Sequence, residues 1–322
     1  MEPAQSRLDE PLAKRVCAYA LREADRVLER AEFLASGMNY VYVCHVVDTG
    51  EALVVRIGKK NAFWEPLDAK YRSEAAAMRY AREILADRAR VPEVYSVGVE
   101  PESALSYLCM EWIEAQSVRK AVAEKRVASD EIAARIMDLV LYMASQPPPF
   151  AVIGGFDGSP LWFDGPALGP FASTAELAAA LLRWSAERLQ ERRPSLSRQL
   201  EDCAVPSVMA RQRRLVFRHG DLSVDNVLVD AEERLVLIDW EWAGVHDERD
   251  VWLELRELME QLGARQLWKD RVPVPEPECE EYYDARELLM GVAWAESIPS
   301  EGEQEAELDY LADAIRSIQA RP

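Results

Sequence analysis

One short segment, residues 218–241, constrains the fold of this chain most, because it predicts a β-hairpin with polar side chains at its open end. Residues 227–229 and 235–238 are apolar, β-branched runs, and the residues between them are polar. Antiparallel strands joined by so short a connection bring their outer ends together. Asn226 precedes the first strand and Asp239 ends the second, so we expect their side-chain oxygens to converge.

A third oxygen-bearing side chain belongs to the same hairpin. Asp221 lies in the loop that enters it, where its carboxylate can face the same opening. Mg²⁺ accepts one carboxylate and one carboxamide and keeps the rest of its shell for water and phosphate oxygens. The three side chains therefore favour a site that holds Mg²⁺ on a nucleotide and takes a proton from a hydroxyl. Each residue alone is equally well explained by a turn or a strand-end cap.

The motifs around these residues resemble a known family. Residues 219–226 read H-G-D-L-x-x-x-N, which is the spacing of the protein-kinase catalytic loop with glycine in place of arginine. Residues 238–244 follow as I-D-W-E-W-A-G. Together they resemble the aminoglycoside phosphotransferase and choline kinase-like family of small-molecule kinases, and most of all its fungal-type branch. The resemblance implies that Asp221 is the catalytic base and that Asn226 and Asp239 are metal ligands.

The same resemblance implies a fold and an activity. The fold is α+β and bilobal, like that of protein kinases, with a small antiparallel-sheet lobe over residues 1–112 and a larger, mainly helical lobe over residues 113–322. The activity is transfer of the γ-phosphoryl group of ATP to a hydroxyl of a small molecule with Mg²⁺ as cofactor. GTP stays open as an alternative donor.

The N-terminal half supplies candidates for nucleotide binding. Residues 52–57 read as a strand that carries Arg56, and Glu74 follows in an alanine-rich segment with high helix propensity. Kinase-like folds pair a strand cation with a helix glutamate and so aim the cation at the phosphates. Arg56 stands where that pattern has lysine, and the two side chains are not interchangeable. Lys59 and Lys60 are rivals for this role.

Two further segments complete the predicted nucleotide site. Ser36, Gly37 and Asn39 form a small-residue turn, which can lay backbone N–H groups against phosphate or can be a plain turn. Met110 and Trp112 lie where the resemblance implies a hinge that binds adenine through the main chain.

Helical patterns account for much of the rest of the chain. We expect one long amphipathic helix over residues 11–33. In the C-terminal half we expect helices over residues 117–125, 130–145, 174–191, 195–211, 248–262, 278–296 and 303–320.

The acceptor site is the part that the sequence defines least. Glu241, Trp242 and Asp247 follow the predicted metal ligand and are candidates for substrate binding. The alternative is that Trp242 packs in the core and that Asp247 caps a helix. Three aromatic residues in a Pro- and Gly-rich segment can line a pocket or simply pack: Trp162, Phe163 and Phe171.

Composition restricts the partners. The net charge of -19 argues against binding to nucleic acid or to an anionic membrane, and it is compatible with a cationic acceptor as well as with mere solubility. The five cysteines have no C-x-x-C spacing, which indicates free thiols in a reducing compartment. With no long apolar run, the chain is expected to be cytoplasmic and not to enter a membrane. The sequence gives no indication of oligomeric state.

Two other functions compete with a small-molecule kinase. The chain could be a catalytically silent nucleotide-binding protein of the same fold, although all three hairpin residues are present. It could also be a protein kinase, but Trp240 and Glu241 follow Asp239 where a protein kinase has the D-F-G motif. A small-molecule phosphotransferase is therefore the preferred prediction.

Overall fold

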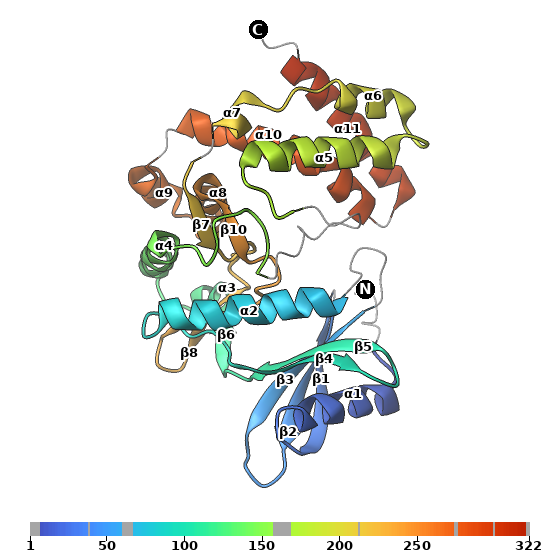
Figure 1. Ribbon diagram of the computed structural model, residues 1–322. Helices are drawn as coiled ribbons and strands as arrows, with labels where there is room; N and C mark the ends of the chain where they lie inside the picture. Colours follow the sequence, from blue (N-terminus) through green and yellow to red (C-terminus); the bar gives the residue numbers. More distant parts are fainter. Residues whose placement is uncertain are drawn as a thin grey trace.

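The computed structural model describes residues 7–319 apart from residues 38, 60–66, 157–168, 212, 274–275 and 299. A sheet flanked by helices forms one end of the molecule, and a helical assembly forms the other (Figure 1). This arrangement confirms the predicted α+β, bilobal, kinase-like fold class. The division at residue 112 stays a prediction. In the described part of the chain, no helix combines the length and the hydrophobicity that a membrane span requires.

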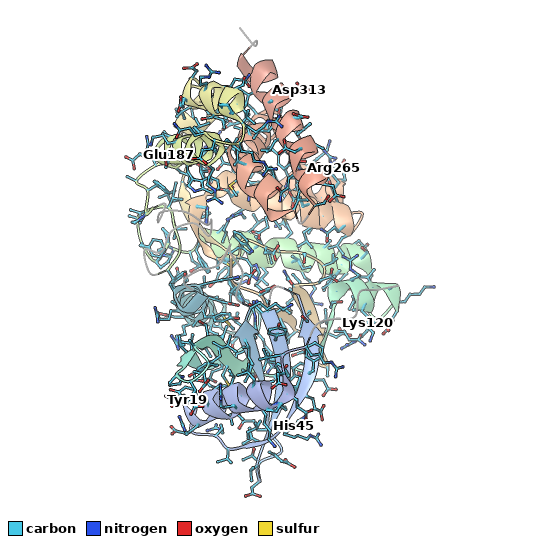
Figure 2. The ribbon with its side chains drawn as sticks, turned by 90° about the vertical axis from the view of Figure 1, so that its right-hand side faces the viewer. Tyr19, His45, Lys120, Glu187, Arg265 and Asp313 are labelled. Atoms are coloured by element: carbon cyan, nitrogen blue, oxygen red, sulfur yellow. The ribbon has the colours of Figure 1, made fainter. Side chains whose placement is uncertain are left out.

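The small lobe is built on five antiparallel strands in the order β1-β2-β3-β5-β4. Their bounds are Leu28–Ser36 (β1), Asn39–Val46 (β2), Ala52–Gly58 (β3), Val94–Glu100 (β4) and Leu105–Glu111 (β5). Helix α1 (Glu10–Arg22) and helix α2 (Leu67–Leu85) pack on opposite faces of this sheet (Figures 1 and 2).

Side chains along β3 alternate between the two faces of the sheet, so alternate residues pack against different helices. Leu53, Val55 and Ile57 belong to the apolar cluster with α1, whereas Val54 belongs to the cluster with α2. Successive side chains of a strand point to opposite faces, so Arg56 shares the α2 face with Val54. That face is the one turned toward the second lobe.

The predicted helix over residues 11–33 is wrong beyond Arg22. The chain leaves the helix at Asp25, whose φ is 57°, and re-enters regular structure as β1. Along β1, Ala31 and Phe33 are half-buried between exposed neighbours, and the Phe33 ring meets that of Tyr42 edge to face, 5.7 Å between centroids. The Glu-, Arg- and Ala-rich composition of this segment has high helix propensity, but pairing with β2 overrides it.

Helices dominate the large lobe. They are Val118–Ala123 (α3), Ser129–Ser145 (α4), Thr174–Leu189 (α5), Pro194–Glu201 (α6), Ser207–Ala210 (α7), Glu248–Gln261 (α8), Arg265–Arg271 (α9), Glu276–Ser297 (α10) and Glu301–Gln319 (α11). The single helix predicted over residues 195–211 is wrong, because the chain breaks before Pro206 and forms α6 and α7. Helix α9 was not expected from the sequence.

Two small sheets connect the lobes. Strands β8 (Val227–Asp230) and β9 (Leu235–Leu237) pair in antiparallel register, which confirms the predicted hairpin. Strand β6 (Ala115–Ser117) pairs with the other edge of β8. Strand β7 (Leu215–Arg218) pairs with β10 (Gly244–Asp247). The segment between β7 and β8 and the segment between β9 and β10 therefore emerge side by side, and these two segments carry the predicted site.

Candidate active site

The loop after β7 is fixed by a buried histidine. The His219 ring is fully buried, its Nε2 lies 2.9 Å from the Ile238 carbonyl oxygen, and its Nδ1 accepts a hydrogen bond from the Asp221 backbone N–H at 3.3 Å. These contacts place the proton on Nε2, in the neutral ring. Burial lowers the pKa of His219 to about 4, so the ring stays neutral at physiological pH. His219 organises the loop and leaves proton transfer to another group.

Gly220 explains why the motif has glycine where protein kinases have arginine. Its φ is 93°, a conformation that favours glycine, and a Cβ at this position would lie 2.1 Å from the Trp242 carbonyl oxygen. The chain after β9 thus passes directly against the loop after β7. Any larger residue would push the two segments apart, and with them Asp221 and Asp239.

Asp221 and Asn226 are in direct contact. The Asn226 side-chain N–H group donates to Asp221 Oδ2 at 2.8 Å and to the Asp221 carbonyl oxygen at 2.9 Å. Burial, reinforced by the nearby carboxylates of Asp239, Glu254 and Glu241, raises the pKa of Asp221 to about 7. The Asp221 side chain is nevertheless exposed, so solvent screens part of this effect. A carboxylate that is open to a reactant and whose pKa is near 7 suits a general base.

Asp239 closes the other side of the opening. Its backbone has φ 64°, and its Oδ1 lies 3.0 Å from Arg56 Nη1. That ion pair lacks hydrogen-bond alignment, and this buried oxygen accepts no hydrogen bond within the described structure. A buried carboxylate oxygen without a hydrogen-bond donor is unusual, which makes Asp239 a candidate to bind a cation in addition to its ion pair with Arg56.

Arg56 links the two lobes through three carboxylates. Its Nη1 donates to Glu74 Oε1 at 2.5 Å, and its Nη2 donates to Glu241 Oε2 at 3.0 Å, in addition to the pair with Asp239. The predicted pairing of Arg56 with Glu74 is confirmed. Burial alone would lower the pKa of Arg56, but these carboxylates raise it well above its usual range. Burial raises the pKa of Glu74 to about 7, with Arg56 acting in the opposite direction.

The two lysines proposed as rivals lie elsewhere. Lys59 donates to Ser36 Oγ and to the Gly37 carbonyl oxygen, both at 2.6 Å, so it closes the turn between β1 and β2. Lys60 lies outside the described residues. Arg56 is therefore the cation of the strand that reaches the cluster.

A second buried cation was missed in the sequence. Lys70, in the first turn of α2, is 2% exposed, and its Nζ lies 2.7 Å from Glu241 Oε2. Burial alone would raise the pKa of Glu241, but Arg56 and Lys70 outweigh it and lower that pKa. A charged residue on a surface helix is normally solvated, and no sequence signal marked Lys70 as an exception.

Carboxylates outnumber cations around this site. Among the described residues, Asp239, Glu74 and Glu241 pair with Arg56, and Glu241 also pairs with Lys70, while the Asp221 carboxylate lies close to Asp239 and Glu241. Within the described part of the chain, Glu74 Oε2, like Asp239 Oδ1, is buried without a hydrogen-bond donor.

A divalent cation fits this excess of carboxylates and the oxygen donors of Asp239 and Asn226. Among the residues described, no group of three or more His, Cys, Asp or Glu side chains is arranged to hold a metal. A nucleotide-bound Mg²⁺ needs fewer protein ligands than that.

The other predicted nucleotide contacts lie in the small lobe. Ser36 and Gly37 form the turn between β1 and β2, and a Cβ at Gly37 would meet no atom within 4 Å. The side chain of Asn39 has a structural contact instead, because its Oδ1 accepts a hydrogen bond from the Tyr71 hydroxyl in the lobe interior at 2.8 Å. Met110 lies near the end of β5 and is buried, while Trp112 just after it is 37% exposed.

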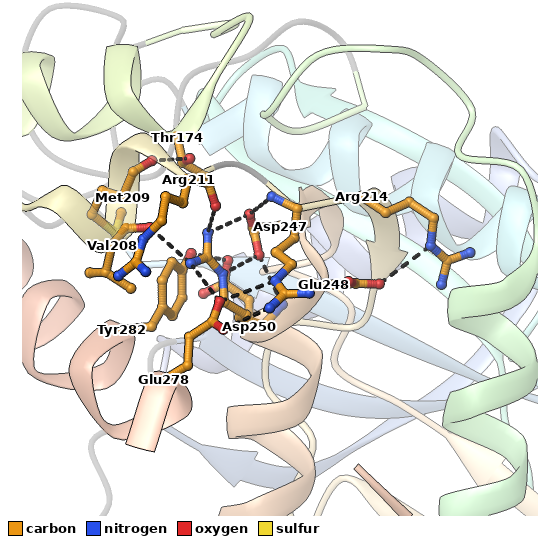
Figure 3. Close-up of polar contacts among 12 residues, drawn as sticks. Thr174, Val208, Met209, Arg211, Arg214, Asp247, Glu248, Asp250, Glu278 and Tyr282 are labelled. Carbon is orange, nitrogen blue, oxygen red and sulfur yellow. Dashed lines mark hydrogen bonds and ion pairs between the residues drawn. The ribbon is translucent and has the colours of Figure 1, made fainter. Parts of the chain in front are cut away.

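The predicted acceptor residues separate into two groups. Glu241 joins the Arg56 cluster, and half-buried Trp242 contributes the backbone that contacts Gly220. Asp247 is removed from the site. Its fully buried carboxylate caps α8 and binds Arg249, so its prediction as a substrate-binding residue is corrected to the capping alternative (Figure 3).

Only one of the three aromatic residues predicted to line a pocket or to pack in the core lies in the described part of the chain. Trp162 and Phe163 lie outside the described residues. Phe171 is half-buried and packs against the apolar cluster of the large lobe, which is the core-packing alternative.

Comparisons with known proteins identify a family and a shared fold. The model of the family described as "Phosphotransferase enzyme family" matches residues 31–249. No curated protein matches the sequence. Several solved structures share the fold at low sequence identity.

A thermostable mutant of aminoglycoside phosphotransferase APH(4)-Ia, in ternary complex with ADP and hygromycin B, has 16% identity and a TM-score of 0.62, covering 94% of this chain and 98% of that chain. Macrolide 2'-phosphotransferase MphH from Brachybacterium faecium has 15% identity and a TM-score of 0.55, covering 92% and 97%. ADP-bound aminoglycoside phosphotransferase APH(2'')-Ib has 13% identity and a TM-score of 0.59, covering 97% and 99%.

Proposed function

We propose that this chain, which belongs to the phosphotransferase enzyme family, moves the γ-phosphoryl group of ATP to a hydroxyl of a small molecule. One observation carries the proposal. A carboxylate whose pKa is raised to about 7, that of Asp221, is held beside Asp239, whose buried oxygen lacks a hydrogen-bond donor and lies next to Arg56. These contacts support the proposal that a base, a cation-binding carboxylate and a phosphate-binding charge act together where the segment after β9 meets the small lobe.

Each residue of the opening has a role in this proposal. Asp221 orients the acceptor hydroxyl and takes its proton, and Asn226 holds the Asp221 carboxylate in place. Asn226 and Asp239 would hold Mg²⁺, which when bound neutralises phosphate charge. Arg56, aimed by Glu74, binds phosphate oxygens. Catalysis of this kind depends mainly on positioning and on charge neutralisation.

The nucleotide is proposed to lie between the lobes. The turn at Ser36 and Gly37 covers the phosphates, and the main chain around Met110 and Trp112 binds the base. Of the three structures named above, two contain ADP, one of them with hygromycin B, and this supports a nucleotide and a small organic acceptor. ATP is the proposed donor, with GTP as the alternative.

The acceptor is proposed to be a cationic small molecule, such as an aminoglycoside or an amino alcohol. The net charge of -19 and the excess of carboxylates around Asp221 support this class. The five free cysteines support the proposal that the enzyme works in a reducing compartment such as the cytoplasm. A protein acceptor is disfavoured because β10 begins at Gly244, soon after Asp239, which leaves no room for an activation segment.

Measurement of ADP release tests this function. Mg–ATP is incubated with a panel of hydroxylated amines that includes hygromycin B and choline, with an unfolded protein substrate as a comparison. We expect at least one amine to accelerate ADP release and to gain a phosphate detectable by mass spectrometry. The Asp221→Asn variant should lose this stimulation. Stimulation by the protein substrate alone would refute a small-molecule acceptor.

A further inference from the structure

A residue outside the opening holds the catalytic loop from behind. Glu254, on α8, is 7% exposed, and its Oε1 accepts a hydrogen bond from the backbone N–H of Leu222 at 2.7 Å. Leu222 directly follows Asp221 in the chain. The carboxylate of Glu254 thus binds the main chain next to the proposed base and does not face the opening.

The peptide unit between Asp221 and Leu222 is held at both ends. Its carbonyl oxygen, that of Asp221, accepts from the Asn226 side chain at 2.9 Å, and its N–H, that of Leu222, donates to Glu254. The preceding amide, the Asp221 N–H, donates to His219. Fixing the amide planes on both sides of a residue fixes its backbone dihedral angles, and so the direction of its side chain.

The environment of Glu254 shows that this contact is not incidental. Among the described residues, its other oxygen, Oε2, is buried without a hydrogen-bond donor, and the Nε–H of nearby Arg218 is buried without an acceptor. A buried carboxylate is costly unless it is paired, and one that faces a backbone N–H gains a charge-assisted hydrogen bond. Gln261, two turns further along α8, accepts from the Val224 N–H at 3.3 Å. Helix α8 therefore holds the loop at two successive points.

We infer that Glu254 is a positioning residue for phosphoryl transfer: it aims the Asp221 carboxylate by holding the Leu222 amide and touches neither nucleotide nor acceptor. This inference rests on the proposed function of Asp221. The hydrogen bond needs an acceptor oxygen rather than a negative charge. Glu254→Gln keeps that oxygen, whereas Glu254→Ala removes it.

The test uses two readouts on the full-length chain. Amide hydrogen exchange, followed by mass spectrometry, reports on protection of the segment 219–226. The slow hydrolysis of Mg–ATP, with water as acceptor, gives kcat and the KM for ATP without a known acceptor. Glu257→Ala is the matched control, because Glu257 is an exposed glutamate on the same helix. Thermal unfolding shows that each variant is folded at the assay temperature.

We expect Glu254→Ala to speed exchange in this segment and to lower kcat roughly ten- to hundredfold with an unchanged KM for ATP, since small misplacements of a catalytic group cost that much. Glu254→Gln should restore both protection and kcat. Glu257→Ala should match the wild type in both.

Two results would overturn the inference. One is wild-type exchange and kcat in Glu254→Ala. The other is a Glu254→Gln variant as impaired as Glu254→Ala, which would assign the effect to the charge beside Arg218. Absence of Mg–ATP hydrolysis in the wild type would count against the proposed function, while the exchange measurements would still decide whether Glu254 holds the loop.

Discussion

Two buried arginines in this protein, Arg249 and Arg56, differ in how well their charge and hydrogen-bond partners are balanced. Arg249 is fully buried, and each of its three guanidinium nitrogens donates at least one hydrogen bond. It binds both oxygens of Asp247, at 2.7 and 2.8 Å, and the carbonyl oxygens of Val208 and Arg211, at 2.8 and 3.0 Å, and it lies against the Tyr282 ring (Figure 3). Arg56, also buried, faces three carboxylates, and two oxygens of these carboxylates have no hydrogen-bond donor among the residues that the structure describes.

The difference separates a structural ion pair from a binding site. Around Arg249, the Asp247 carboxylate and two carbonyl groups accept four hydrogen bonds from the guanidinium, the Glu278 carboxylate lies 3.7 Å from Nη1, and the unit ties α8 to α7. Around Arg56, excess negative charge and unsatisfied oxygens persist, although they cost stability in a buried place. Such an imbalance is sustained where a ligand supplies the missing charge. We therefore assign binding of Mg²⁺ and phosphate to the Arg56 cluster and stability to the Arg249 cluster.

The largest expected effect comes from the base at the edge of the Arg56 cluster. Asp221→Asn should lower phosphoryl transfer by about 10²–10⁴-fold, because the amide cannot accept the proton. Affinity for Mg–ATP, measured by calorimetry, should be nearly unchanged. Asp225→Asn is the matched control, since Asp225 lies in the same loop but pairs with Arg119 at the surface. Retained turnover in Asp221→Asn would remove Asp221 as the base.

The second effect concerns the oxygen of Asp239 that lacks a donor. Asp239→Asn should weaken Mg–ATP binding by at least about tenfold, equivalent to about 1.4 kcal/mol, because a charged metal ligand becomes neutral. Calorimetric titration measures it, and the same titration in EDTA is the control. In EDTA the wild type and the variant should bind ATP alike, since the difference arises from the metal. An equal loss in EDTA would contradict this role.

The third prediction compares the two arginines directly. Arg249→Met should lower the free energy of unfolding by about 3–5 kcal/mol, because it leaves the buried Asp247 carboxylate with backbone N–H donors but without the cation that pairs with it. The folded fraction should keep its Mg–ATP affinity. Arg56→Met should lower that affinity by at least about tenfold. For both variants, chemical denaturation measures the free energy of unfolding and calorimetry measures the affinity for Mg–ATP. If Arg249→Met also weakened nucleotide binding in the folded fraction, the distinction between the clusters would fail.

The smallest effect is a pH-dependent gain of stability. The raised pKa of Asp221, about 7 in the folded chain, exceeds its unfolded value, so the ionised carboxylate destabilises the fold. The penalty is absent below the unfolded pKa, develops as pH rises toward 7 and is complete above it. Asp221→Asn should therefore unfold at a higher temperature than the wild type at pH 8 and at the same temperature near pH 4. Because Asp221 is exposed, the gain is modest. A gain that is equal at both pH values would point to another cause.

Local patterns predicted the parts of the site that are close in sequence. The hairpin of β8 and β9 follows from two β-branched runs and a polar turn, so the meeting of Asn226 with Asp221 could be expected. The pairing of Glu74 with Arg56 came from the resemblance to kinase-like folds, which pair a strand cation with a helix glutamate, and not from a local pattern.

The remaining features of the fold and of the site depend on contacts between residues far apart in the sequence, and local sequence patterns do not predict such contacts. Lys70 and Glu254 look like ordinary polar residues of amphipathic helices, and they are buried only because the opposite lobe or the catalytic loop packs on them. Strand β1 was predicted as helix because its composition favours helix, whereas its partner strand β2 determines its structure. Asp247 was assigned to the acceptor because it follows Glu241 closely, but β10 carries it into the core.

The central claim is that Asp239 and Asn226 complete a divalent-cation site together with the nucleotide. Electron paramagnetic resonance with Mn²⁺ in place of Mg²⁺ tests it most directly, by measuring free Mn²⁺ during titration of the protein with the non-hydrolysable analogue AMP-PNP. We predict that the protein and AMP-PNP together bind Mn²⁺ more tightly than AMP-PNP alone, and that Asp239→Asn or Asn226→Ala abolishes the difference. Mn²⁺ binding that the protein does not strengthen, or that both variants leave unchanged, would contradict the account.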